Sequence, residues 1–115
     1  MDILERAKLC AKAIDDKKAK GVDLLDVSAQ TSLCDYFVIG SCQSTTQVKA
    51  CADWVEEKMK EAGYPLHHAE GYAGGNWILL DFTDIIVHLM TDETRNFYDI
   101  ERLWEDAVEI PLEFE

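Results

Sequence analysis

The chain has 115 residues, the length of one ordinary domain, and residues 1–115 are expected to fold as a single unit. Its 48% hydrophobic content is typical of a globular protein, and no apolar run of about 18 residues exists to span a membrane. The net charge of -12, from 23 acids and 11 bases, repels phosphate backbones and excludes nucleic acid as the main binding partner. An acidic surface instead favours a basic protein partner, or simply keeps the protein in solution.

The N-terminus mixes acids with bases and has neither the apolar stretch of a secretory signal nor the composition of a transit peptide. A cytoplasmic location is therefore expected. The four cysteines, Cys10, Cys34, Cys42 and Cys51, contain no C-x-x-C pair and lie in apolar contexts. This pattern predicts buried free thiols in a reducing compartment, and not disulfides or a zinc site.

The first half of the chain begins with a predicted amphipathic helix. Asp2 and Glu5 are spaced as a helix start, and apolar residues then recur at helical intervals until Gly21 offers a stop. The β-branched and aromatic runs at 22–27 and 35–42 predict two strands with a modest connection.

A second helix and three more strands are expected in the middle of the chain. Ser44 and Gln47 form a capping-box pattern, and a regular apolar stripe follows until Gly63. The strands are predicted at 64–71, 76–82 and 84–90, with a glycine turn at 73–76.

The C-terminal segment predicts one last helix. Thr91 can cap it, and Phe97, Ile100 and Trp104 share a face that is expected to be its core stripe. The acidic tail from about residue 105 cannot form a long helix because it contains Pro111. This order of elements predicts a mixed α/β (α+β) domain, in which a five-stranded mixed sheet is flanked by helices.

The last two strands form a predicted hairpin with two different faces. With a two-residue loop at Phe82 and Thr83, Asp81 pairs with Asp84, Leu79 with Ile86 and Trp77 with His88. The mixed face then holds Trp77, Leu79, Asp81, Asp84, Ile86 and His88, and the apolar core face holds Ile78, Leu80, Phe82, Ile85, Val87 and Leu89. A three-residue loop would shift this register by one.

Catalysis finds little support in the residue pattern. His88 has no nearby Ser or Cys at a spacing that predicts a triad, and the adjacent His67 and His68 point to opposite faces of a strand. The GSCQS run at 40–44 resembles a phosphate loop at a helix start, but nucleotidyl transfer also needs two closely spaced carboxylates for magnesium. No such pair follows, so the sequence predicts no enzyme activity, no metal and no cofactor.

Docking to another protein fits the residue types better, because interface centres favour tryptophan, tyrosine and arginine. Trp77, Arg95, Tyr98 and Glu101 are the candidates for such a surface. An alternative for Arg95 is an ion pair with Asp92 or Asp99 along its own helix, which would contribute only a few tenths of a kcal/mol.

Three segments carry a resemblance to a known family. They are DKKAKGVDLLDV (16–27), LCDYFVIGSCQSTTQVKACAD (33–53) and EGYAGGNWILLDFTDIIVHLMTDETRNFYDIERLW (70–104). DYFVI, the glycine turn before W-x-L-x-D, the VH strand and the R-x-F-Y-x-x-E-x-L-W ending are highly specific in combination. The chain resembles the ribosomal silencing factor family, RsfS or Iojap, over nearly its whole length.

The resemblance implies a nucleotidyltransferase-like fold without the catalytic acids. It implies binding to the basic ribosomal protein L-fourteen on the large subunit, where the factor blocks joining with the small subunit and represses translation when nutrients are short. Free family members can also form homodimers. A residual nucleotidyltransferase and an acidic adaptor for another basic protein are the alternative functions.

The family motifs also suggest roles for individual residues. Trp77 and Tyr98 are expected to be apolar anchors, and Arg95 is expected to fix the helix or a partner carboxylate. Acidic residues are expected to face basic side chains. The full predicted set of partner-binding residues is Trp77, Asp81, Asp84, His88, Arg95, Tyr98 and Glu101.

Overall fold

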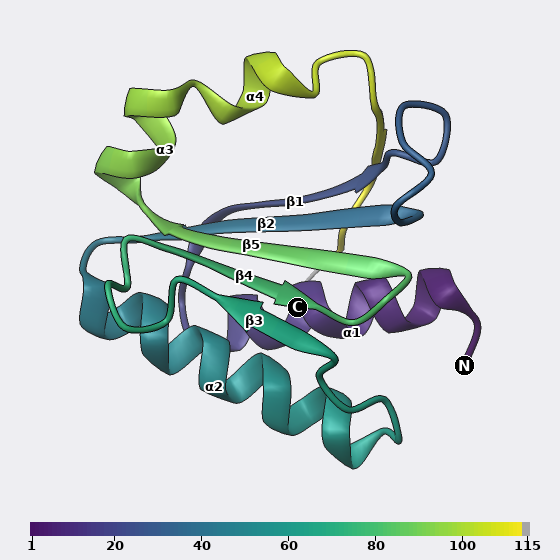
Figure 1. Ribbon diagram of the computed structural model, residues 1–115, viewed down its shortest axis with the longest axis horizontal. Coiled ribbons are helices and arrows are strands. Elements are labelled where there is room, and N and C mark those ends of the chain that lie inside the picture. Colours follow the sequence, from purple (N-terminus) through teal and green to yellow (C-terminus); the bar gives the residue numbers. More distant parts are fainter. Residues whose placement is uncertain (114–115) are drawn as a thin grey trace.

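The computed structural model describes residues 1–113, which form four helices and six strands. One sheet lies between two helical layers, with α1 and α2 on one side and α3 and α4 on the other (Figure 1). In chain order the elements are α1 Ile3–Asp16, β1 Lys20–Asp26, β2 Tyr36–Cys42, α2 Thr45–Glu61, β3 His68–Glu70, β4 Trp77–Asp81, β5 Ile85–Thr91, α3 Asp92–Tyr98, α4 Ile100–Leu103 and β6 Val108–Ile110. Within these residues no helix is long and apolar enough to cross a bilayer.

The strand order is β3-β4-β5-β2-β1-β6. β2 and β5 run parallel, and the other neighbouring strands of the described sheet are antiparallel. β2 lies inside the sheet with helices over both faces, which explains why its sequence is nearly continuous in apolar residues. The predicted mixed α/β class is confirmed, although the sheet has six strands and not five.

The additional strand is β6, which falls in the segment predicted to be an acidic tail. It pairs antiparallel with β1, so that Leu24 lies opposite Ile110 and Asp26 opposite Val108. The apolar residues alternate just before Pro111, which ends the strand. A three-residue strand carries too little periodicity to be predicted, and it exists because β1 offers a free edge.

The N-terminal helix begins as predicted and ends earlier. The Asp2 side chain accepts a hydrogen bond from the Glu5 backbone N–H at 2.8 Å, and the Glu5 side chain accepts one from the Asp2 N–H at 3.3 Å. The helix nevertheless ends at Asp16 and not near Gly21, because Lys18 takes a left-handed φ of 63° and the chain turns into β1. The second helix matches its predicted limits, with Ser44 as its N-cap.

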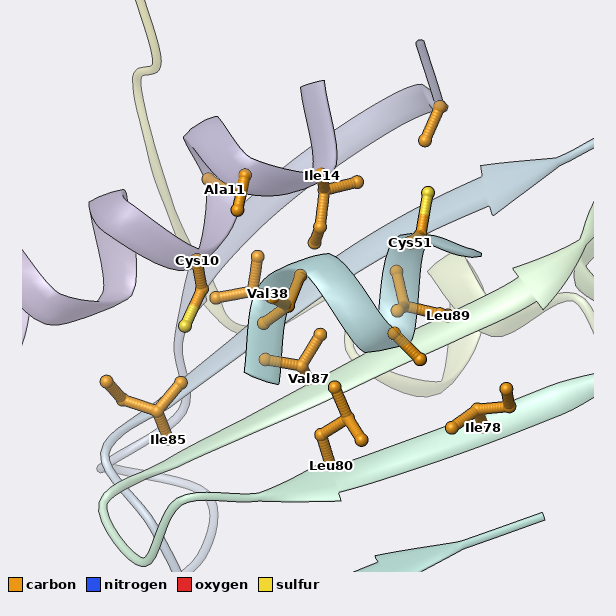
Figure 2. Packing of buried hydrophobic residues seen from close by; sticks show 14 of the residues in the cluster. Cys10, Ala11, Ile14, Val38, Cys51, Ile78, Leu80, Ile85, Val87 and Leu89 are labelled. Atoms are coloured by element: carbon orange, nitrogen blue, oxygen red, sulfur yellow. The ribbon is translucent and has the colours of Figure 1, made fainter. Parts of the chain in front are cut away.

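The larger core lies between the sheet and the α1–α2 layer (Figure 2). Here α1 approaches β2 so closely that a Cβ on Gly40 would lie 2.6 Å from the Ile14 side chain. The four cysteines are buried and free, as predicted. Burial raises the pKa of Cys10 to about 12 and that of Cys34 to about 11, so both thiols stay protonated at neutral pH.

The β4–β5 hairpin has its predicted faces but a different register. Trp77 pairs with Met90, Leu79 with His88 and Asp81 with Ile86. The Phe82 N–H donates to the Ile85 carbonyl at 2.9 Å, so the loop consists of Thr83 and Asp84. The predicted loop was wrong by one residue, because Phe82 is buried and bonds to Ile85 across the hairpin, so the turn begins after it. The resulting register shift of two residues leaves the side chains of both strands on their predicted faces, whereas Asp84 lies in the loop.

The edge strand β3 is shorter than expected. The prediction covered 64–71, whereas pairing with β4 is limited to His68–Glu70, all of it exposed. In the described sheet β4 is its one neighbour, and the preceding Tyr64 and Leu66 pack against the larger core without joining the strand.

Candidate functional site

The predicted last helix is broken into two short ones. Asp99 takes a left-handed φ of 50° between α3 and α4, and this break changes which side chains face the sheet. Ile100 is buried, and the Trp104 ring packs edge-on against Phe37 at 4.6 Å, as a core role predicts. Phe97 is instead 79% exposed, so its assignment to the core stripe was wrong.

A row of aromatic rings runs from the surface into the sheet. The ring centroids of Phe97 and Tyr98 lie 5.0 Å apart, and those of Tyr98 and Trp77 lie 5.5 Å apart. The row continues from Trp77 to His88 at 6.0 Å and from His88 to Phe37 at 4.7 Å. The exposed end of the row is therefore supported by packed rings down to the second, smaller core cluster.

His88 supports Trp77 through a hydrogen bond. The Trp77 Nε1–H donates to His88 Nδ1 at 3.2 Å, and because tryptophan is only a donor, the neutral imidazole must carry its proton on Nε2. This Nε2 is buried and has no hydrogen-bond partner within residues 1–113. Burial lowers the pKa of His88 to about 4, so the ring is neutral at physiological pH. As a whole residue His88 is half-buried.

Two cavities open beside Trp77. One of about 420 Å³ is lined by Asn76, Trp77, Glu93, Thr94, Phe97 and Tyr98. The other, of about 210 Å³, is lined by Ile39, Trp77, His88, Ile100, Leu103 and Trp104. Tyr98 and Leu103, which border them, are 54% and 64% exposed. Together Trp77, Phe97, Tyr98 and Leu103 form a grooved apolar surface, which we call the aromatic surface.

Arg95 is not on the surface, contrary to the sequence-based prediction. It is 8% exposed, and its guanidinium reaches from α3 across β2 to β1. Nη2 binds Asp23 Oδ2 at 2.7 Å, Nη1 donates to the Gly21 carbonyl at 2.6 Å, and Nε binds Glu101 Oε1 at the start of α4. These contacts with β1 and α4 replace the alternative of an ion pair with Asp92 or Asp99 along its own helix. We call Gly21, Asp23, Arg95 and Glu101 the Arg95 latch.

A β-bulge in β1 creates the acceptor for this arginine. Between Lys20 and Asp23 the pairing with β2 gains one extra residue, and Gly21 takes a left-handed φ of 57° there. A Cβ on Gly21 would lie 2.8 Å from Arg95 Nη1, so a glycine is needed for the close approach. Burial alone would raise the pKa of Glu101, but its hydrogen bonds and the Arg95 charge lower it below its usual value.

Two predicted site residues lie at the other end of the hairpin. Asp81 is four residues from Trp77, roughly 13 Å along the strand at about 3.3 Å per residue. Its Oδ1 accepts a hydrogen bond from the Thr83 N–H at 2.7 Å, and Asp84 lies 3.7 Å from the guanidinium of Arg6. Asp81 thus stabilises the turn, Asp84 pairs with α1, and neither carboxylate adjoins the aromatic surface.

Charge is distributed unevenly along the chain and between the layers. Arg95 and Arg102 are the only lysines or arginines after Lys60, whereas acids continue to the C-terminus. Arg95 is occupied by the latch, so the exposed charge of α3 and α4 is mainly carboxylate. The aromatic surface consequently has an acidic rim.

Nothing in this arrangement has the geometry of a metal-dependent active site. Within residues 1–113 no group of three or more His, Cys, Asp or Glu side chains is placed to hold an ion. The Ser41 hydroxyl of the loop resembling a phosphate site donates to the Lys20 carbonyl at 3.2 Å, and the Arg95 guanidinium lies 3.4 Å from it. Ser41 is therefore part of the sheet's own packing.

Sequence reasoning missed Phe97, Leu103, Gly21 and Asp23. The exposure of Phe97 and Leu103 depends on the break at Asp99, and the one local signal for it is that aspartate tolerates a left-handed conformation better than most residues. Gly21 and Asp23 bind an arginine that is more than seventy residues away in the chain, so no pattern in the sequence around them indicates this contact.

Comparisons with known proteins agree on one family. The family model described as ribosomal silencing factor during starvation matches residues 1–115. A ribosomal silencing factor RsfS from Chromobacterium violaceum is 42% identical over 104 residues, covering 90% of this chain and 85% of that protein. A crystal structure of a protein from the same organism superimposes with a TM-score of 0.88 at 38% identity, covering 100% of this chain and 95% of that one.

A eukaryotic relative also has a name that refers to the ribosome. The mouse protein named mitochondrial assembly of ribosomal large subunit protein 1 is 32% identical over 91 residues, covering 76% of this chain and 40% of that protein. A relative from Bacillus subtilis, 35% identical over 107 residues, is likewise named ribosomal silencing factor RsfS. The chain belongs to the family of ribosomal silencing factors.

Proposed function

We propose that this protein binds the large ribosomal subunit through the basic ribosomal protein L-fourteen and sterically blocks joining with the small subunit. Translation is thereby repressed when nutrients are limiting. The observation that carries the proposal is the aromatic surface, a grooved apolar area with an acidic rim. Exposed aromatic residues at the centre and charges at the rim are the composition of a protein-binding site, and the acidic rim complements a basic partner.

The proposal assigns contact with the partner to Trp77, Phe97, Tyr98 and Leu103, with Glu101 at the rim. Arg95 and His88 support this surface from below, and Asp81 and Asp84 are left outside the contact area. Binding takes place in the cytoplasm, where the bacterial relatives' ribosomes are located. Self-association of the free protein remains a separate prediction that light scattering can measure.

The test is to mix the protein with separated large and small subunits at magnesium concentrations that normally join them, and to follow the particles by sedimentation. We expect the protein to travel with the large subunit and joined ribosomes to disappear. Unchanged joining, with the protein left at the top of the gradient, would refute the proposal and favour an adaptor for another basic protein.

Two variants locate the contact. Trp77→Ala should cost about 2 kcal/mol or more of binding free energy if Trp77 anchors the interface. Because Trp77 also supports the fold through His88, Phe97→Ala is the cleaner variant, since a side chain that is 79% exposed contributes little to stability. The matched control is Leu33→Ala, which removes an apolar side chain that is 80% exposed, from the loop that precedes β2.

We expect Phe97→Ala to weaken binding about tenfold and Leu33→Ala to leave it unchanged, with both variants melting at the wild-type temperature. Equal affinities for Phe97→Ala, Leu33→Ala and the wild type would remove α3 from the contact area.

A further inference from the structure

The helix α3 has almost no apolar anchor of its own, although it carries two residues of the aromatic surface. Among Asp92–Tyr98, Arg95 is the buried residue, and Phe97 and Tyr98 face solvent. A helix of seven residues is too short to persist through its backbone hydrogen bonds alone. Apart from the Thr91 cap and the packing of Tyr98 on Trp77, its position on the sheet depends on the contacts that Arg95 makes.

These contacts join α3 to β1 and α4, and a longer hydrogen bond of 3.4 Å reaches the Ser41 hydroxyl of β2. The guanidinium binds the Gly21 carbonyl and the Asp23 carboxylate of β1, and its Nε binds Glu101 of α4. A planar guanidinium can satisfy all three acceptors at once because its donors are fixed in a fork. The latch thus fixes the distance from β1 to α3 and the angle between α3 and α4 across the left-handed Asp99.

We propose that Arg95 is a positioning residue for ribosome binding, which holds α3 and α4 in the arrangement that forms the aromatic surface. This inference rests on the proposed function. Arg95 itself does not touch the partner. When the latch is absent, α3 detaches from the sheet while the core beneath α1 and α2 stays intact, because that core contains no residue of α3 or α4.

The test compares Arg95→Ala with Arg102→Ala. Both variants remove one positive charge from the same segment, but the Arg102 side chain is 80% exposed and pairs with Asp99 at 3.4 Å. If α3 in Arg95→Ala occupies its bound position about one tenth of the time, the apparent Kd for large subunits rises about tenfold. Arg102→Ala should bind like the wild type or slightly more tightly, because the added negative charge favours a basic partner.

Amide hydrogen exchange supplies a readout that does not require ribosomes. In Arg95→Ala we expect faster exchange confined to residues 92–104, with the amides of α2 (Thr45–Glu61) protected as in the wild type. Arg102→Ala should exchange like the wild type throughout. Wild-type affinity in Arg95→Ala, or exchange in 92–104 that does not change, would overturn the inference.

Two further variants guard against a trivial loss of folding. Arg95→Lys keeps the charge but cannot reach all three acceptors, so binding to large subunits should stay weak. Full recovery of binding in Arg95→Lys would show that Arg95 acts only through its charge. Glu101→Gln removes the negative charge from one latch contact, made by a partly exposed side chain, and it should raise exchange in 92–104 less than Arg95→Ala does. If the wild type itself fails to bind large subunits, the proposed function falls, while the exchange pattern still decides whether the latch holds α3.

Discussion

The buried imidazole of His88 should make the stability of this protein depend on pH. In the folded state the ring accepts a hydrogen bond from Trp77, and burial lowers its pKa to about 4 from an ordinary value of 6.5. In the unfolded chain the ring is hydrated and titrates near the ordinary value. Between these two pKa values the unfolded state binds more protons than the folded state, so stability falls as the pH falls.

The magnitude follows from the two pKa values. At pH 7.5 neither state is protonated at this position, and the contribution is close to zero. At pH 5 the unfolded ring is almost fully charged and the folded ring almost fully neutral, which corresponds to a loss of about 2 kcal/mol. Against a typical total stability of roughly 5–15 kcal/mol, such a change is easily measured.

The assay is urea unfolding of the wild type and His88→Asn at several pH values from 7.5 to 5. The Asn oxygen can accept the Trp77 hydrogen bond at the position of Nδ1, but it does not titrate. His67, His68 and the carboxylates are common to both proteins, so their effects cancel in the difference between the two curves. The wild type should lose about 2 kcal/mol more than His88→Asn; parallel curves would refute the reasoning.

Other predictions concern the bulge and the first helix. Gly21→Ala should destabilise the protein by about 1–2 kcal/mol through its left-handed φ, with a further loss from contact with Arg95, as measured by chemical unfolding. Gly63→Ala is the control, because its φ is also positive but no atom lies within 4 Å of the added Cβ; equal losses would show that the Arg95 contact is unimportant. Asp2→Ala removes the N-cap of α1 and should cost about 1 kcal/mol, and an unchanged melting temperature would mean that the N-terminus frays in the wild type.

Features with a local cause were predictable. The N-cap side chains of α1 and α2 each accept a hydrogen bond from the backbone N–H three residues on, so the signal and the structure lie within one turn. The faces of the β4–β5 hairpin were also predictable because side chains alternate along a strand. Even a wrong loop position at Phe82 could not alter them, since the shift was an even number of residues.

Features that depend on distant partners were not predictable. The 97/100/104 spacing gave a good apolar stripe, and the break at Asp99 turned Phe97 outward into solvent. Arg95 had acidic neighbours at helical spacing and instead crosses a strand to reach Asp23. Exposed ion pairs along a helix contribute so little that a multidentate buried site easily outweighs them.

The sequence by itself determined the family, the mixed α/β class and the presence of aromatic residues and acids suited to docking. Those properties follow from residue type, period and motif. The tertiary structure alone decided that Phe97 and Leu103 belong to the aromatic surface, that Arg95 supports it from below, and that Asp81 and Asp84 lie at the opposite end of the hairpin. Exposure and proximity depend on how separate elements pack, and packing joins residues whose positions in the chain carry no information about one another.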